Sequence, residues 1–193
     1  MFLSFGPALP AFFAKNVKNP GKYNHKNIVF KKNQNRLYLS NKGENMKAIL
    51  VESSNSYMAK NATDPVDWSP SLDKKIFNML TTVGGVCVCS KYTYGVLPQK
   101  MLNDPARQFI IAERTGDKSL QSLNVIYPNA YLIGGPTFLK AAYDTGVVDM
   151  IIINTMQTPI ESTDRYKNPF HGNLPQPIKE IRFDELTVRI YKI

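Results

Sequence analysis

Five short apolar runs, each rich in β-branched residues, are the feature that most restricts how this chain can fold. They cover residues 48–51, 86–89, 109–112, 130–133 and 147–153 of the 193-residue sequence. Runs of this length are typical of strands that are buried on both faces of a parallel sheet. The segments between them are long enough to hold crossover helices, so the sequence predicts an α/β fold.

Three of the connecting segments have a helical pattern. Residues 72–81 place apolar side chains at helical spacing, and Ser69 or Ser71 is available as the N-cap. Residues 136–143 follow the same spacing, and a less regular pattern covers residues 94–102. The predicted helices alternate with the predicted strands, as in a sheet that is covered on both faces.

The tail of the chain predicts a different kind of pairing. Residues 178–193 form two alternating stretches that meet at residues 184–185, which is typical of a β-hairpin. We therefore expect a single domain over residues 46–193. Its fold would be a mostly parallel central sheet flanked by helices, with an antiparallel C-terminal hairpin.

The net charge of +9 is concentrated in residues 1–45. This leader holds eight Lys or Arg residues and one Glu, whereas the remaining chain has 16 basic and 14 acidic residues. The main part of the chain is therefore close to neutral, and we expect no nucleic-acid partner. The leader shows no sustained apolar period. Codons for residues 42–46, "KGENM", can also read as a bacterial ribosome-binding site before a start codon. We therefore hypothesise that Met46 is the true start and that the leader is not native protein.

Composition also restricts where the protein works. No stretch approaches the ~18 consecutive apolar residues of a membrane-spanning helix, so we expect no membrane partner. Cys87 and Cys89 are two positions apart in a predicted strand, where the pleat does not bring the sulfur atoms together for a disulfide. A reducing cytoplasm is the simplest location. We expect a monomer without a metal site.

A glycine pair follows the fourth apolar run, in "AYLIGGPTFLK". Gly134 and Gly135 lie between a predicted strand and a predicted helix that starts at Pro136. Bare backbone at such a turn lets a ligand approach closely, and the helix N-terminus offers N–H groups to a phosphate. A plain turn is the alternative, because the full Gly-x-Gly-x-x-Gly spacing is absent.

An acidic residue lies on the apolar side of the first predicted helix, in "WSPSLDKKIF". Asp73 and Phe77 are four residues apart and so share one helical face. This places a carboxylate toward the core, as in a ligand site. The alternative is an exposed Asp in the first turn that stabilises the helix dipole.

Taken in order, these blocks and four others resemble the dihydrofolate reductase family. The resemblance covers nearly all of residues 46–193. The matching positions are Trp68, Asp73 and Phe77; Ser90, Lys91 and Thr93; Pro105, Ala106 and Arg107; Arg114; Ile133, Gly134, Gly135 and Pro136; and Asn154.

The resemblance implies a reductase fold and a set of roles for the substrate dihydrofolate. Asp73 would be the catalytic carboxylate, which binds the pterin ring and supports protonation at N5. Arg107 would pair with the α-carboxylate of the substrate, although taken alone it could be a surface residue at a turn. The implied substrate-binding residues are Leu50, Trp68, Asp73, Phe77, Leu97, Arg107 and Asn154.

The resemblance also implies NADPH as the cofactor. Gly134, Gly135 and Thr137 would hold the pyrophosphate, and Arg114 would lie beside the adenosine 2′-phosphate. Taken alone, each of the cations could simply be solvated. The implied cofactor-binding residues are Ala59, Lys91, Tyr92, Thr93, Arg114, Ile133, Gly134, Gly135, Pro136, Thr137 and Phe138.

The chain departs from the family pattern at several points. Ser90, Ala106 and Pro136 stand where glycines are usual, and Glu113 adds a negative charge near the expected phosphate. Proline is tolerable there because the first residue of a helix forms no intrahelical N–H bond. These departures bear on turnover more than on the fold. A divergent, compact sequence of this kind is similar to phage or mobile-element members of the family.

Two other functions remain open from the sequence. One is the pyrimidine reductase of riboflavin synthesis, which shares the Gly-Gly turn, but Trp68 and Asp73 do not fit its pattern. The other is a catalytically weak binding or structural protein on the same fold, which the departures at Ser90 and Glu113 would suit.

Overall fold

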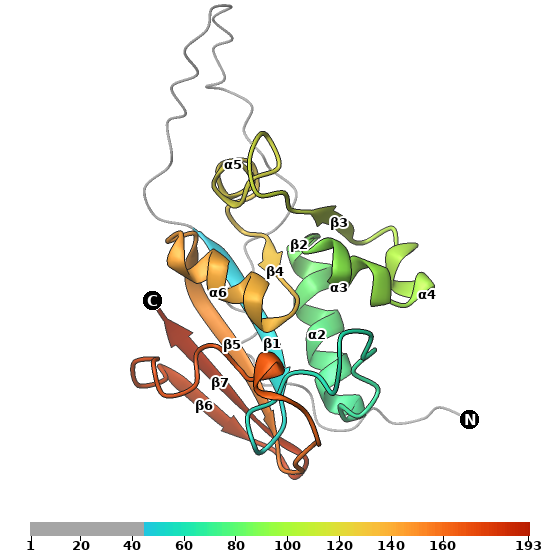
Figure 1. The fold of residues 1–193 in the computed structure, drawn as a ribbon, viewed down its shortest axis with the longest axis vertical. Helices are drawn as coiled ribbons and strands as arrows, with labels where there is room; N and C mark the ends of the chain where they lie inside the picture. The colour runs from blue at the N-terminus through green and yellow to red at the C-terminus, as the bar shows by residue number, and fades with distance from the viewer. Residues whose placement is uncertain (1–44) are drawn as a thin grey trace, which may run out of the picture. The chain divides into compact units, whose positions relative to one another are not determined.

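A seven-stranded mixed sheet is the centre of the protein in the computed structural model, which describes residues 45–193. The strand order is β3-β2-β4-β1-β5-β7-β6 (Figure 1). The strands are β1 (Met46–Glu52), β2 (Val86–Cys89), β3 (Gln108–Ile111), β4 (Tyr131–Leu132), β5 (Val148–Met156), β6 (Lys179–Arg182) and β7 (Leu186–Lys192).

The pairing of these strands confirms the predicted fold class. All neighbours from β3 to β5 pair in parallel, and β5, β7 and β6 pair antiparallel. Each of the five apolar runs forms a strand, although β4 is only two residues long. The hairpin of β6 and β7 closes one edge of the sheet, with its turn at the expected Asp184 and Glu185.

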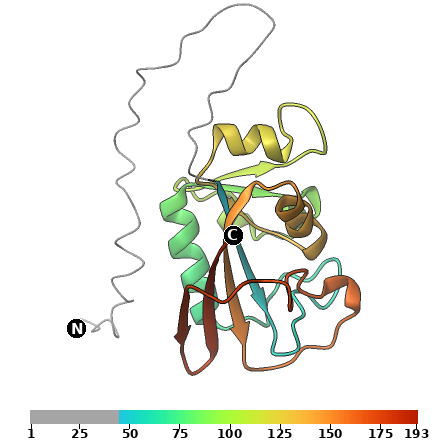
Figure 2. The same cartoon turned by 90° about the vertical axis from the view of Figure 1, so that its left-hand side faces the viewer.

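Helices cover both faces of the sheet. Figure 2, seen together with Figure 1, shows α2 on one face and α6 on the other. The helical segments are α2 (Ser71–Gly84), α3 (Lys91–Val96), α4 (Gln99–Leu102), α5 (Leu120–Ile126), α6 (Pro136–Asp144) and the 3₁₀ turn η1 (Asp164–Tyr166).

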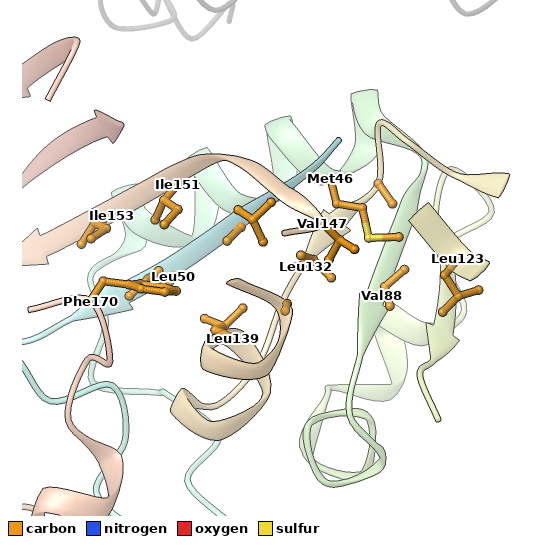
Figure 3. Packing of buried hydrophobic residues seen from close by; sticks show 14 of the residues in the cluster. Met46, Leu50, Val88, Leu123, Leu132, Leu139, Val147, Ile151, Ile153 and Phe170 are labelled. Carbon is orange, nitrogen blue, oxygen red and sulfur yellow. The ribbon is translucent and has the colours of Figure 1, made fainter. Parts of the chain in front are cut away.

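The alternation along the strands divides the core between these two faces. Leu50, Ile151 and Ile153 belong to the large cluster that also holds Leu139 and Phe170 (Figure 3). On the helix α2 itself, Ile76 is fully buried and Leu80 nearly so. Each such side chain contributes roughly 1.5–3 kcal/mol when it is fully buried, so the amphipathic faces of the helices fix their position on the sheet.

Two predictions about the helices are wrong in detail. The N-cap of α2 is Pro70, without a side-chain cap, rather than Ser69 or Ser71. Helix formation begins directly at Ser71, and the Ser69 side chain hydrogen-bonds Asp73 instead. The segment 94–102 is divided between α3 and α4, because Pro98 has no N–H and holds Leu97 extended.

The helix α5 was not expected from the pattern. It begins after Ser119, whose hydroxyl accepts a hydrogen bond from the Ser122 N–H at 3.3 Å. Only Leu123 of this short helix is buried. With one buried position, the segment lacks the repeated apolar spacing by which the other helices are recognised.

Other sequence-based expectations have different outcomes. The leader falls outside the described residues up to position 44, so the start at Met46 stays a hypothesis. Cys87 and Cys89 are buried free thiols, as predicted. Among residues 45–193, no helix is long and apolar enough to span a bilayer. The same residues hold no group of three metal-ligating side chains.

Candidate active site

An open cleft of about 1380 Å³ lies along the carboxyl ends of the parallel strands. Residues that follow β2, β3 and β4 line it, together with Leu50 and Val51 of β1. Ligands of α/β sheets commonly bind at this edge. Because single-ligand pockets usually measure roughly 300–1,000 Å³, the cleft can hold a cofactor and a substrate together.

One end of the cleft contains a buried carboxylate. Asp73, in the first turn of α2, is only 6% exposed and lines the cleft. Its Oδ1 accepts a hydrogen bond of 2.7 Å from the Nδ2 of Asn154, which is fully buried in β5. The alternative interpretation of Asp73 as an exposed dipole-stabilising residue is therefore wrong.

This environment raises the proton affinity of Asp73. Burial raises the pKa of its carboxyl group, and hydrogen bonds from Asn154 and Ser69 and the charge of Lys74 oppose the rise only in part. The side-chain oxygen of Asn154, Oδ1, has no hydrogen-bond partner among the described residues. A carboxyl group that has a raised pKa and lines a cleft is suited to bind a polar ring or to exchange a proton with a ligand.

The glycine pair forms the wall of the cleft between β4 and α6. Gly134 has a φ of 144°, and a Cβ atom built on it would lie 2.7 Å from the Oγ1 of Thr93. Gly135 is the N-cap of α6, and a Cβ there would meet no atom within 4 Å. Thr93 and the glycine pair thus share one wall, and open space lies in front of Gly135.

Charged and aromatic side chains surround the other end of the cleft. Glu113 and Arg114 follow β3, and Lys91 begins α3 with its Nζ 5.1 Å from the centre of the Tyr92 ring. Glu113 forms an exposed ion pair with Lys118 at 3.6 Å. This end can hold an anionic or hydroxyl-rich group near the surface.

Most residues predicted for the site line this one cleft. The cleft brings together side chains that are far apart in the sequence. They come from both the predicted substrate-binding residues and the predicted cofactor-binding residues. The predicted residues that line it are Leu50, Ala59, Asp73, Phe77, Lys91, Tyr92, Thr93, Leu97, Arg114, Ile133, Gly134, Gly135, Pro136, Thr137 and Phe138.

Three predicted residues, Trp68, Arg107 and Asn154, lie outside the lining of the cleft. Asn154 is behind Asp73, as described above. The indole Nε1 of Trp68 donates to the carboxylate of Asp64 at 2.8 Å, so this side chain supports the loop before α2. Arg107 faces Asp104 and the side of α2, because two acceptors on that helix and one carboxylate in its own turn surround the guanidinium.

Asp64 and Val66, in the loop before α2, were not among the predicted site residues. Both residues line the cleft, and Val66 has a φ of 58°, which is rare for a β-branched residue. The Val66 N–H donates to Asp64 Oδ1 at 2.7 Å, which holds the strained turn. Strain of this kind costs of order 1–3 kcal/mol and is common at functional sites. Nothing in the local pattern marks a valine for this conformation.

Two departures from the family pattern have a local explanation. Ser90 is the N-cap of α3 and accepts a hydrogen bond from the Thr93 N–H at 3.2 Å. Pro136 begins α6 directly after its N-cap Gly135, where no intrahelical N–H bond is lost. Both substitutions therefore fit the helix starts beside the cleft.

Comparison with known proteins adds no relative. No model of a known protein family matches the sequence, and a search of curated proteins gives no match.

Proposed function

We propose that this protein reduces 7,8-dihydrofolate to tetrahydrofolate with NADPH and so supports thymidylate synthesis. The observation that carries the proposal is the buried Asp73 carboxylate at one end of a cleft whose middle is a glycine turn. A ring with adjacent N–H donors suits the carboxylate, and a pyrophosphate suits the turn. We expect it to act as a monomer in the cytoplasm.

The glycine turn fits a dinucleotide for two reasons. The space in front of Gly135 is open, and the nine-residue helix α6 begins there with unpaired backbone N–H groups. Lys91 and Arg114 add positive charge along the cleft toward β3. When bound, NADPH would supply the hydride, which leaves its C4 and forms the new bond at C6 of dihydrofolate.

The residues of the chain would orient the pterin and manage one proton. Asp73 would accept hydrogen bonds from the ring amino group and N3, while Phe77 and Leu50 would contact the ring faces. Solvent supplies the proton that N5 gains, so one hydride and one proton are added to the substrate. The carboxyl group of Asp73 favours this transfer because it lies next to the ring and has a raised pKa.

A direct assay tests this proposal. Purified protein is mixed with NADPH and 7,8-dihydrofolate, and the loss of NADPH absorbance is followed with and without methotrexate. We expect turnover that requires both reactants and that methotrexate inhibits. If both ligands bind by calorimetry without turnover, the protein is a binding protein on this fold. If neither ligand binds, the proposed function is wrong.

Arg114 provides a test of cofactor recognition. We expect Arg114→Ala to raise the Kd for NADPH by roughly tenfold or more, since one charge-assisted hydrogen bond contributes about 1.5–3 kcal/mol. The Kd for NADH, which has no 2′-phosphate, should change less than about twofold on the same scale. Lys91→Ala should also weaken NADPH binding more than NADH binding. The effect should be smaller, because an ammonium group is a point charge on a flexible chain. Equal losses for both cofactors would show that Arg114 is not at the phosphate.

A further inference from the structure

Arg107 already holds a carboxylate of its own chain. Its Nε and Nη2 both donate to Asp104 Oδ2, at 3.1 and 2.7 Å. Its Nη1 donates to Asn78 Oδ1 at 2.9 Å and to Thr81 Oγ1 at 3.2 Å. The side chain of Arg107 is only 6% exposed. The planar fork that would suit a ligand carboxylate is therefore occupied.

Asp104 is fixed in this position by its own turn. Its Oδ1 accepts a hydrogen bond from the Ala106 N–H at 3.0 Å, and its carbonyl oxygen accepts one from the Arg107 N–H at 3.1 Å. The backbone of Ala106 and the guanidinium of Arg107 lower the pKa of Asp104, so it stays ionised at neutral pH. The ion pair is thus built into four consecutive residues and needs no ligand.

The pair lies behind the part of the cleft wall that α2 contributes. Phe77 and Asn78 of α2 both line the cleft, and Asn78 is the lining residue that hydrogen-bonds Arg107. A ligand carboxylate would have to displace Asp104 to reach the guanidinium. That exchange replaces one charge-assisted pair by another and leaves Asp104 unpaired, so it yields little net affinity.

We propose that Asp104 takes the place of a ligand carboxylate on Arg107, so that the site recognises the reduced pterin ring and not an anionic tail. The proposal rests on the function proposed above and specifies its substrate class. Dihydropterins without a glutamate tail, such as 6-methyl-7,8-dihydropterin, should be reduced as well as dihydrofolate. The chemistry is unchanged, because C6 and N5 belong to the ring.

The test compares substrates with and without the tail. The value of kcat/KM is measured for 7,8-dihydrofolate and 6-methyl-7,8-dihydropterin with the parent protein, Asp104→Asn, Arg107→Ala and the control Glu180→Gln. Glu180 also pairs with arginines, Arg182 and Arg189, but lies on β6 outside the cleft lining. Melting temperatures identify any variant that fails to fold.

We expect the parent protein to use both substrates within about tenfold of each other, which is the effect of roughly one hydrogen bond to a charged group. Asp104→Asn, which frees the guanidinium, should raise kcat/KM for dihydrofolate by about tenfold on the same scale and leave the dihydropterin value within about twofold. Arg107→Ala should change kcat/KM for both substrates by the same factor. Glu180→Gln should leave both values unchanged.

Two results would overturn the proposal. One is a preference of the parent protein for dihydrofolate by more than about a hundredfold. The other is a loss in Arg107→Ala that is confined to dihydrofolate, which stays informative even if Asp104→Asn does not fold. A parent protein that binds and reduces neither substrate would instead remove the proposed function, and this inference with it.

Discussion

Replacement of Asp73 by Asn is expected to lower dihydrofolate turnover by about a hundredfold or more at neutral pH, the usual range for a general acid or base group being ~10²- to 10⁴-fold. Asparagine keeps the size of the side chain but presents an NH₂ donor where the pterin also presents donors. The Kd for NADPH should stay within about threefold, because the cofactor would bind at the glycine turn. The loss should lessen toward acid pH, where solvent can protonate the substrate.

The same substitution should not reduce stability. The pKa of Asp73 is raised above its ordinary value of 3.8, mainly by burial, so the folded state holds the proton more tightly than the unfolded chain. The contribution of this group to stability is therefore fully present below pH 3.8 and is lost as pH rises through the raised value. A neutral Asn avoids that loss and can still accept the hydrogen bond from Asn154.

Turnover, the Kd for NADPH and Tm should be measured on one preparation, with Asp184→Asn in the exposed hairpin turn as a control. We expect the Asp73→Asn protein to melt at or above the parent Tm at neutral pH, with the difference shrinking as pH falls. Unchanged turnover would remove Asp73 from the chemistry. It would also remove the main support for the proposed reaction.

Gly134→Ala is expected to be the most damaging change in the glycine turn. Its φ of 144° is strained for any residue with a Cβ, and the new atom would lie 2.7 Å from Thr93 Oγ1. Backbone strain of this kind costs of order 1–3 kcal/mol. The displacement of Thr93, which also bonds Ser90 at 3.1 Å, adds to that cost. Both stability and NADPH binding should therefore fall.

Gly135→Ala is the matched control for this change. Gly135 has a negative φ, and an added Cβ would meet nothing within 4 Å. We expect its free energy of unfolding to stay within about 0.5 kcal/mol of the parent value, which is the usual range for neutral positions. Its Tm should therefore stay close to that of the parent. If a dinucleotide lies against this backbone, the variant should still bind NADPH more weakly than the parent. Equal Tm values for the two alanine variants would contradict the strain assigned to Gly134.

Periodicity in the sequence determined most of the fold. The apolar run at 86–89 corresponds to β2 residue for residue, because buried strands leave a continuous apolar signal. The run at 109–112 matches β3 with a shift of one residue, although β3 is an edge strand and only partly buried. The helix α5 left no such signal, since it buries only Leu123. The break between α3 and α4 at Pro98 could have been predicted from the sequence, because proline has no backbone N–H to donate.

The candidate site could be predicted from the sequence only in part. The spacing of Asp73 and Phe77 and the glycine pair were visible in the sequence, and the structure brings them into one cleft. The orientation of Arg107 could not be predicted, because its partners Asn78 and Thr81 come from the distant helix α2 and Asp104 binds the same guanidinium. Local sequence therefore determined which side chains lie near the cleft. Only tertiary packing decided which of them turn into it, since each polar group bonds the partner that folding brings closest.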